Sequence, residues 1–460
     1  MRSPIKSLGP ILLASTVGLG GAVQTAHSHA RAAAASPLTL TVAYQQFGPP
    51  PYWDQLWWQK TAQQISKQYP NITIKLEPIV ADEGSYYTKV DLALRSASTT
   101  PDLVREDSFL VSSDVTAGYL EPLDRYLSSW SEYKQQWYPA MQQITQFNGH
   151  NYGIMNGTDD RLIYYNKNLF KQAGLSTNWQ PKTWADILSA AQTIKRKVHN
   201  VIPINMYTGI INDEASTMQT FEMLLYGTPD AAHLYDYKTK KWVISSKGIQ
   251  DTLAFVQKIY DPSALLGPPS NIALNSQVGT VVAQNLLPNS KLAIDVDGSW
   301  MPSTWYKNGA HPWPQWQSVL GVAKMPTEFG QGARYVTLSG GWAYSISARS
   351  KNKDAAFKAL QVLNNKDMLS YYDSNAGQVT PRKDVADTRA YSGVPLNPYF
   401  TSMLSFTQFR PGYPAYPKIS NEIDRAMQSV MEGTSPQAAM TTYSQHVTNL
   451  AGASSVEKLK

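Results

Sequence analysis

The residues of this chain best suited to chemistry are Asp159, Asp160 and Arg161, three charged side chains that precede the apolar run LIYY. Because side chains in a strand alternate between two faces, we expect Asp159 and Arg161 on one face and Asp160 on the other. A carboxylate and a guanidinium on one face can accept and donate hydrogen bonds to the hydroxyl groups of one ligand. The alternative role for Asp159 and Arg161 is an internal ion pair that fixes the loop.

Three further candidates stand where a strand ends or a glycine turn occurs. Asp107 ends the run DLVRED, and ligands of open α/β sheets bind beyond the carboxyl ends of strands. Its alternative role is to cap the helix that follows. Trp300 and Trp342 come directly after the turns DGS and SGG. Glycine lets the backbone approach a ligand closely, and each ring offers a flat apolar face; the alternative for each ring is packing in the core.

The sequence lacks the residues or motifs that several kinds of catalysis require. There is no cysteine, which excludes disulfides, thiolate metal sites and a cysteine nucleophile. The histidines show no metal-ligand spacing, and neither a GxSxG motif nor a P-loop occurs. We therefore expect neither a metal nor another cofactor. Glycoside hydrolysis needs two carboxylates, and Asp107 together with Asp159 or Glu83 remains open as such a pair.

The beginning of the chain predicts export. Arg2 and Lys6 precede an apolar run that small residues follow, which is the pattern of a secretory signal peptide over residues 1–34. Removal of this segment, which also contains Arg31, lowers the formal charge from +6 to +3. We expect the remaining chain in a periplasm or at a cell surface, and not as a Cys-linked lipoprotein.

Composition favours a neutral ligand. A small net charge on so long a chain gives no case for nucleic acid. Charged residues make up 16% of the chain, against ~25% in typical globular domains. Tryptophan and tyrosine are abundant instead, at 13 and 27 residues. Such rings suit polyhydroxylated ligands, whose apolar faces stack on them while their hydroxyl groups form hydrogen bonds.

Strands and helices alternate along the chain, which predicts α/β sheets with parallel strands. The expected strands are 37–44, 72–79, 102–107, 158–166, 201–206, 291–296 and 343–348. The expected helices are 54–69, 86–96, 184–197, 215–226, 248–261, 353–364 and 419–450, the last interrupted at 432–436. Thr183 is expected to cap the helix from Trp184, with Asp186 three residues later. No low-complexity linker separates two halves, which fits a chain that crosses several times between two lobes.

Six segments occur together in an order and spacing that resemble a known family. They are PDLVREDSFLVSSDVTAGYLEPLD at 101–124, NGHNYGIMNGTDDRLIYYNKNLFKQAGL at 148–175, PKTWADILSAAQTIK at 181–195, LAIDVDGSW at 292–300, SGGWAYSISARSKNKDAAFKAL at 339–360 and VTPRKDV at 379–385. With these segments the chain resembles the extracellular solute-binding proteins of carbohydrate ABC importers, the group that includes maltose- and trehalose-binding proteins.

The resemblance implies a two-lobed periplasmic-binding-protein fold of type II. Each lobe would be a mostly parallel sheet flanked by helices, with the ligand cleft between the lobes. The N-terminal lobe would comprise 35–157 and 343–385, and the C-terminal lobe 158–342 and 386–460. The resemblance further implies a monomer that does no catalysis, binds a carbohydrate and docks on the membrane permease subunits of an ABC importer.

The resemblance also assigns site residues. Asp159 and Arg161 match a Thr-Asp-x-Arg hinge motif, Trp300 matches a stacking tryptophan, and Gly341 with Trp342 matches a second hinge turn. All five would contact the ligand.

Four more residues complete the expected site. Asp107 matches a cleft-facing acid, and Phe47 and Glu83 occupy loops that often reach the ligand. Arg382 lies at the third crossing between the lobes. Two alternatives stay open: a secreted glycoside hydrolase that uses Asp107 with another carboxylate, and a binding protein of this fold for a polyol phosphate or a peptide.

Overall fold

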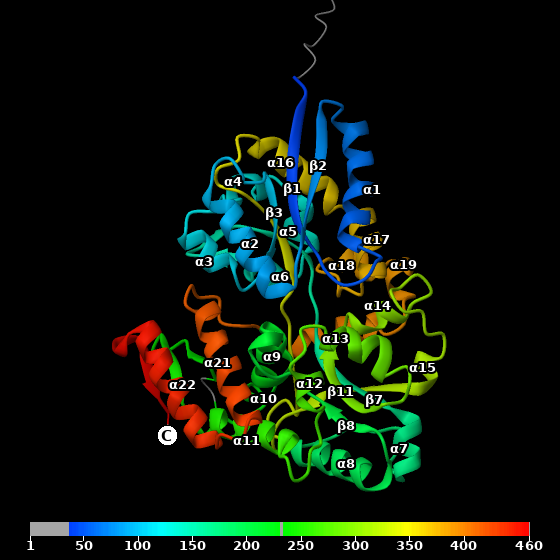
Figure 1. Ribbon diagram of the computed structural model, residues 1–460. Coiled ribbons are helices and arrows are strands. Elements are labelled where there is room, and N and C mark those ends of the chain that lie inside the picture. Colours follow the sequence, from blue (N-terminus) through cyan, green and yellow to red (C-terminus); the bar gives the residue numbers. More distant parts are fainter. Residues whose placement is uncertain (1–35, 231–232, 460) are drawn as a thin grey trace, which may run out of the picture. The chain divides into compact units, whose positions relative to one another are not determined.

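The structure is a computed structural model that describes residues 36–230 and 233–459. The expected signal peptide, residues 1–34, lies outside the described residues. From Pro37 onward the chain forms one unit, which contains two main sheets (Figure 1). Within the described part, no helix has the length and hydropathy needed to span a bilayer.

The first main sheet has five strands in the order β2-β1-β3-β15-β6. Their bounds are β1 (Leu38–Gln46), β2 (Ile72–Val80), β3 (Leu103–Asp107), β6 (Ile154–Gly157) and β15 (Trp342–Ile346). β1 pairs in parallel with β2 and β3, whereas β15 pairs antiparallel with β3 and β6. All strands except β15 therefore run in one direction. The prediction of a mostly parallel sheet is confirmed, with one reversed strand where the chain returns from the second sheet.

Helices cover both faces of the first sheet, as the alternation of its side chains requires. On one face Leu103 packs in a cluster with Trp57 and Trp58 of α1 (Trp53–Gln68). This cluster also holds residues of α16 (Lys353–Leu363) and α17 (Lys366–Ala376). On the other face Val104 packs with Tyr86 of α2 (Glu83–Arg95). In Figure 1, α1 and α2 accordingly lie on opposite sides of β1 and β3.

The second main sheet has four strands in the order β12-β7-β11-β8. Their bounds are β7 (Arg161–Asn166), β8 (Ile202–Asn205), β11 (Leu292–Gly298) and β12 (Leu320–Ala323). β11 is parallel to β8, and β7 is antiparallel to both β11 and β12. Again a single strand is reversed, because β7 enters this sheet from the first one.

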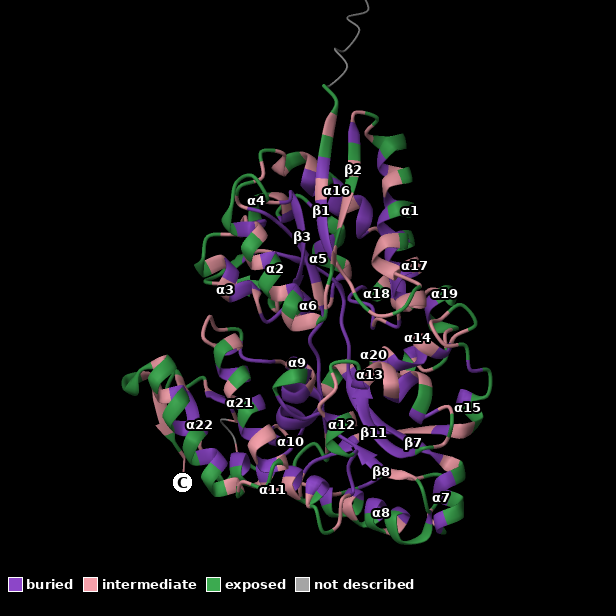
Figure 2. Ribbon diagram, in the orientation of Figure 1, coloured by how far each residue is buried: buried purple, intermediate pink, exposed green. Residues whose placement is uncertain are grey.

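Successive residues of β7 serve two cores. Ile163 and Tyr165 belong to a cluster that includes residues of α7 (Lys167–Ala173), α8 (Trp184–Lys197), α11 (Lys247–Tyr260) and α21 (Tyr416–Met431). Leu162 and Tyr164 belong to a second cluster with Trp305 of α14 (Met301–Trp305) and with residues of α20 (Asn397–Met403). Figure 2 shows this pattern as buried residues along the strands, whereas helices such as α8 alternate between buried and exposed positions.

Smaller elements complete the fold. The remaining strands are β4 (Gln146–Phe147), β5 (His150–Asn151), β9 (Tyr235–Asp236), β10 (Lys241–Ser245), β13 (Met325–Pro326), β14 (Tyr335–Leu338), β16 (Thr407–Gln408) and β17 (Val456–Lys458). The remaining α-helices are α3 (Val111–Thr116), α4 (Asp124–Leu127), α5 (Ser131–Gln136), α6 (Pro139–Gln143), α9 (Glu214–Ser216), α10 (Met223–Leu225), α12 (Ser270–Ala273), α13 (Val278–Val281), α15 (Trp316–Val319), α18 (Lys383–Ala386), α19 (Arg389–Ser392) and α22 (Pro436–Ala451). Short 3₁₀ or π turns are η1 (Ile210–Asn212), η2 (Thr217–Glu222), η3 (Val282–Leu286), η4 (Leu404–Phe406) and η5 (Ala453–Ser455).

Local signals set the ends of α8 and of the last two helices. Thr183 and Asp186 form a reciprocal capping box at the start of α8, as expected. The break expected at 432–436 separates α21 from α22. The sequence pattern is thus confirmed at these positions.

Three crossings connect the two main sheets, and they are bonded to one another. Thr158 and Val379 exchange backbone hydrogen bonds of 2.9 and 2.8 Å. The Thr158 hydroxyl donates to the carbonyl oxygen of Gly340 at 2.9 Å. The segments between β6 and β7, between β14 and β15, and beyond α17 therefore run side by side.

Candidate functional site

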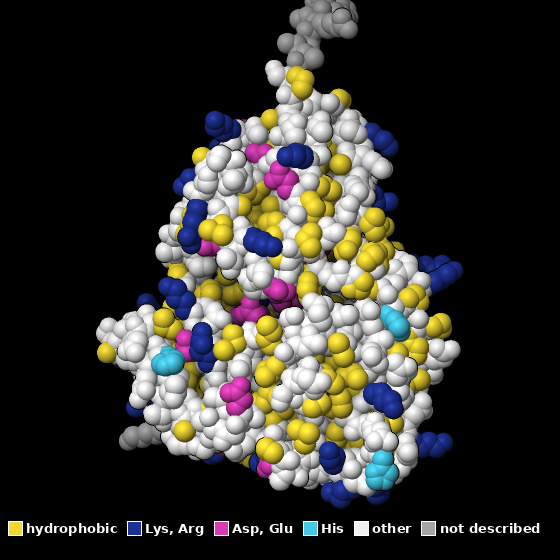
Figure 3. Space-filling view, viewed as in Figure 1, with side chains coloured by type: hydrophobic (Ala, Val, Ile, Leu, Met, Phe, Trp, Pro, Cys, Tyr) yellow, Lys and Arg dark blue, Asp and Glu magenta, His cyan; other side chains and the backbone are white. Residues whose placement is uncertain are grey.

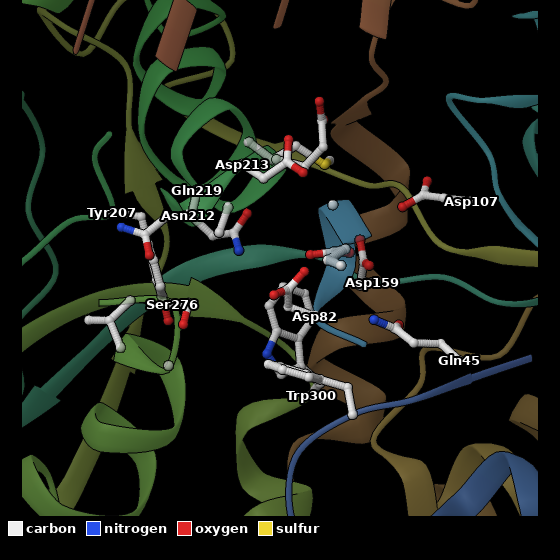
Figure 4. Close-up of a pocket in the computed structure, with 18 of the residues that line it drawn as sticks. Gln45, Asp82, Asp107, Asp159, Tyr207, Asn212, Asp213, Gln219, Ser276 and Trp300 are labelled. Carbon is white, nitrogen blue, oxygen red and sulfur yellow. The ribbon is translucent and has the colours of Figure 1, made fainter. Parts of the chain in front are cut away.

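A cavity of about 730 Å³ lies beside these crossings. Its lining includes residues from the ends of β1, β3 and β11 and from the loop that leads into α9. The expected site residues in the lining are Phe47, Glu83, Asp107, Asp159, Arg161, Trp300, Gly341 and Trp342. Arg382 is absent from the lining. Figure 4 shows Asp82, Asp159 and Trp300 near the centre of the cavity, facing Gln219 and Asp213.

Asp159 and Arg161 point into the cavity, and they also form an ion pair with each other. The backbone N–H of Gly340 donates to Asp159 at 2.8 Å, and the Arg161 guanidinium donates to the carbonyl oxygen of Leu338 at 3.3 Å. The two side chains therefore line the cavity and form an internal ion pair at the same time. The pair is fixed by the second crossing before any ligand arrives.

Asp160 points away from the cavity, as the alternation predicts. It is fully buried and accepts a hydrogen bond from the Ser339 hydroxyl at 3.2 Å. Burial, together with the charge of Asp159, raises the pKa of Asp160 well above its usual value. The Asp160 carboxyl group therefore helps to hold the first and second crossings together.

Each of the two tryptophans lies beneath a guanidinium. Arg161 lies 5.0 Å from the ring centroid of Trp300, and Arg105 lies 3.9 Å from that of Trp342. The Trp300 ring folds back over Gly298, where an added Cβ would come within 2.0 Å of it. Only glycine at this position leaves room for the ring to reach the cavity. Both rings are half-buried, so their remaining surface is available to a ligand.

Asp107 is held by an arginine that the sequence did not single out. Arg410 donates to Asp107 at 2.5 Å and to Glu214 at 2.8 Å, and its guanidinium lies 4.3 Å from the ring centroid of Phe109. Asp107 ends β3, whereas Glu214 begins α9, so this cation joins elements of the two main sheets. The cap position of α3 is Leu110, without a side-chain cap, and the Asp107 carboxylate accepts from the backbone N–H of Phe109 at 3.4 Å, ahead of the helix.

Glu83 belongs to a second acidic group in the cavity. The Tyr87 hydroxyl lies 2.9 Å from a Glu83 oxygen and 3.0 Å from an Asp107 oxygen. Burial and the charge of Asp107 raise the pKa of Glu83 to about 7. Burial and the charges of Glu214 and Glu83 raise the pKa of Asp213 to about 8. These carboxyl groups therefore hold protons more tightly than exposed acids do.

Phe47 lies at the exposed edge of the cavity, whereas Arg382 lies outside its lining. Phe47 is 44% exposed and lies in the cavity lining, where it adds an apolar edge. Arg382 is 1% exposed; it pairs with Asp384 at 2.8 Å and with Glu132 at 3.2 Å. This position does not agree with the expectation that Arg382 contacts a ligand. Its guanidinium is buried and already binds Asp384 and Glu132 near the third crossing.

Polar residues from both main sheets line the cavity without having been expected from the sequence. They are Gln45, Asp82, Ser85, Arg105, Tyr207, Asn212, Asp213, Glu214, Gln219, Ser276, Gln378, Arg410 and Gln428. A signal for some of them exists: the run Asn212–Glu214 follows soon after β8, and the rule that pointed to Asp107 applies to this strand as well. Arg410 follows the two-residue strand β16 and has no local signal. Among residues 36–230 and 233–459, no cluster of acids and histidines has a geometry suited to a metal ion.

The structure thus joins two mixed sheets, flanked by helices, through three bonded crossings, beside a cavity lined with rings and charged groups. The model of the bacterial extracellular solute-binding protein family matches residues 50–368, and the chain belongs to this family. The family consists of binding proteins, which agrees with the expectation that the chain is not an enzyme.

Individual relatives are similar over most of the chain. A putative binding protein of Brucella abortus is 25% identical over 408 residues, which cover 88% of this chain and 90% of the relative. A solute-binding protein of Thermotoga lettingae, solved with α-D-tagatose, superposes with a TM-score of 0.74 at 23% identity and covers 90% of this chain and 99% of its own. The maltose-bound MalE3 protein of T. maritima gives the same TM-score at 20% identity, with coverages of 90% and 99%. These structures establish the fold.

Proposed function

We propose that this protein captures a mono- or oligosaccharide outside the cytoplasmic membrane and delivers it to the permease of an ABC importer. One observation carries the proposal: Trp300 and Trp342 line a single cavity together with the Asp159–Arg161 ion pair. Sugars present apolar ring faces and a rim of hydroxyl groups, and this lining offers a partner for each. Because crossings and guanidinium groups hold these side chains in place, little ordering cost remains for binding.

Relatives of the same fold support a sugar as the ligand. The T. lettingae protein was solved with α-D-tagatose and the MalE3 protein with maltose. One binds a monosaccharide and the other a disaccharide, so the fold accommodates ligands of different length. A cavity of about 730 Å³ falls in the ~300–1,000 Å³ range of small-molecule sites.

Delivery requires that two lobes close on the ligand and present the loaded form to the permease. We place the N-terminal lobe at 35–157 and 343–385 and the C-terminal lobe at 158–342 and 386–460, with a hinge at the three crossings. Tyr391 of α19 packs in the cluster of the first sheet, so we extend the N-terminal lobe beyond 385 to include α19. The chain would then touch the hinge at Val379 and leave this lobe between α19 and α20, whose Phe400 packs with the second sheet.

The pairing of charges argues against the other candidate ligands and activities. A phosphate group would need a free cation, but Arg161 and Arg410 are each engaged by carboxylates. A glycoside hydrolase would need Asp107 as an acid or a nucleophile, yet Arg410 and Tyr87 already occupy its oxygens. A binding protein free of catalysis fits this pairing best; we further propose that it acts as a monomer, and without a cysteine it has no Cys-linked lipid anchor.

Isothermal titration calorimetry against mono- to tetrasaccharides of different linkage tests the proposal. We expect saturable one-to-one binding by at least one sugar, without release of product. If none of these saccharides bound to the protein, and circular dichroism showed that it was folded, the proposal would be wrong. Turnover of a bound oligosaccharide, lost in Asp107→Asn, would favour the hydrolase instead.

A further inference from the structure

The cavity holds more carboxylates than cations. Its arginines are Arg105, Arg161 and Arg410, and neither lysine nor histidine occurs in its lining. Its acids are Asp82, Glu83, Asp107, Asp159, Asp213 and Glu214. Figure 3 shows acidic side chains gathered beside a hollow near the middle of the viewed face.

Every arginine of the cavity is already paired. Arg161 binds Asp159, and Arg410 binds both Asp107 and Glu214. Arg105 binds Asp54, outside the lining, at 3.1 Å. In the part of the chain that the structure describes, these arginines form no ion pair with Glu83 or Asp213.

Glu83 and Asp213 belong to different elements but come close together. Asp213 precedes α9, and a Cβ added to Gly84 would lie 2.4 Å from its carboxylate oxygen. Asp213 therefore touches the residue that follows Glu83. After burial and Glu214, the charge of Glu83 also helps to raise the pKa of Asp213 to about 8.

Glu83 and Asp107 share a single hydroxyl donor, that of Tyr87. The Tyr87 hydroxyl has one hydrogen, but it lies within 3.0 Å of both Glu83 and Asp107. It can serve only one of the two carboxylates. The other contact requires a proton on a carboxyl group or a cation from outside.

Two buried acceptors in the same lining also lack donors. Gln219 is 6% exposed and Glu214 is 3% exposed. The Oε1 atom of each has no hydrogen-bond partner among the described residues. Figure 4 shows the Gln219 amide directed into the cavity, across from Asp82 and below Asp213. A buried acceptor without a donor is costly, so the site is built for a ligand that brings donors.

From this geometry we infer that the physiological ligand is a cationic amino sugar, whose ammonium group binds between Glu83 and Asp213 while Glu214 and Gln219 accept hydrogen bonds. The inference deepens the proposed function and rests on it. An ammonium group supplies three donors and a positive charge, but no acceptor. It offsets the repulsion between the two carboxylates, which a neutral sugar leaves in place.

Matched sugars test the charge directly. Glucose, galactose, mannose and cellobiose are each titrated at pH 7 beside the 2-amino-2-deoxy form and its N-acetyl derivative. We expect the free amine of a scaffold that binds to be favoured over its hydroxyl and N-acetyl forms by about tenfold or more, or ~1.4 kcal/mol. Equal or tighter binding of the neutral forms would overturn the inference and leave the proposed function intact. No binding by any saccharide would overturn both.

Isosteric variants locate the ammonium site. Glu83→Gln and Asp213→Asn should each lower the preference for the amino sugar over its hydroxyl form by about tenfold or more. Asp354→Asn is the control, because it removes the same charge from a side chain that is 82% exposed on α16. Loss of affinity for neutral and amino forms alike, in variants with unchanged melting temperature, would contradict an ammonium site.

Discussion

Under the proposed function, the ring of Trp300 stacks on a face of the sugar. It lies half-buried in the cavity, with the Arg161 guanidinium 5.0 Å from its centroid. Trp300→Ala removes a stacking face worth ~1–3 kcal/mol by analogy with stacked bases. We expect the dissociation constant measured by calorimetry to rise by about 5- to 150-fold.

A tryptophan outside the cavity provides the control. Trp179 packs against Tyr165 and Phe170 and is not part of the cavity lining. Trp179→Ala should lower the melting temperature but leave the dissociation constant unchanged. If Trp300→Ala also left affinity unchanged, the ring would serve packing alone.

Arg410 makes a different kind of contribution, to stability. Its guanidinium is the shared partner of two buried carboxylates, Asp107 and Glu214. Arg410→Gln leaves these charges without a cation, which typically costs about 3–5 kcal/mol. Urea denaturation should show this loss in the free energy of unfolding.

An exposed arginine offers a matched comparison. Arg425 pairs with Glu422 at 3.6 Å, and its side chain is 57% exposed, so Arg425→Gln should cost only about 0–1 kcal/mol. Losses of similar size in the two variants would show that the Arg410 contacts add nothing beyond a surface pair.

Glu83 and Asp213 should make the stability of the ligand-free protein depend on pH. Their folded pKa values, about 7 and about 8, lie above the unfolded values. Between about pH 4 and pH 8 the folded state thus keeps protons that the unfolded chain has released. Stability from these two groups is highest at low pH and falls as the pH rises through this window.

A double variant that cannot titrate at these two positions tests the expected pH dependence. Glu83 faces Asp107, Tyr87, Glu214 and Arg410, and Asp213 faces Glu214, Glu83 and Asp82. In thermal melts from pH 5 to pH 8, the double variant Glu83→Gln, Asp213→Asn should lose less stability on raising the pH than the parent protein does. An equal or steeper fall in the variant would contradict the assigned protonation.

For single residues, the sequence correctly predicts which neighbouring side chains point in the same direction. The alternation expected over 158–166 separates Asp159 and Arg161 from Asp160; the structure begins β7 only at Arg161, but it keeps this separation. Arg410 and Asp107 are distant in sequence, and no local pattern links them. Contacts of that kind arise from the crossings and need the tertiary structure.

Among the elements, the second crossing depends on Gly341. Its φ of 114° lies in a region that other residues rarely adopt, and an added Cβ would lie 2.3 Å from the carbonyl oxygen of Gly157. Gly341→Ala should therefore lower the free energy of unfolding by more than about 1 kcal/mol. The measurement is again urea denaturation.

Gly412 is a suitable control for this substitution. No heavy atom lies within 4 Å of a Cβ built there. Gly412→Ala should leave stability unchanged, or raise it by up to about 1 kcal/mol through the unfolded state. A loss as large as that of Gly341→Ala would point to a general effect of alanine and not to crowding at the crossing.

Helices and strands could be predicted from the sequence where the hydrophobic periodicity and the capping residues indicate the same element. The capping box at Thr183 and the break between α21 and α22 follow directly from residue types. The reversed strands β7 and β15 did not, because strand direction depends on which sheet the chain comes from. Pairing between distant strands is a property of the whole chain and not of a local window.

For the whole molecule, the three crossings explain how binding and delivery are coupled. Thr158 is bonded to both Gly340 and Val379, so the crossings act as one connection. Acids of the cavity come from both sides of it: Asp107 from β3 and Glu214 from α9. Under the proposed function, a ligand that contacts both sides favours closure of the lobes, because its additional contacts stabilise the closed form over the open one.

A crystal structure of the protein with the tightest-binding saccharide tests this account most directly. We predict electron density for the sugar in the cavity, with one ring stacked on Trp300 or Trp342 and hydroxyl groups within hydrogen-bond distance of Asp159 or Arg161. A saccharide bound elsewhere on the protein, with the cavity occupied only by water, would contradict it.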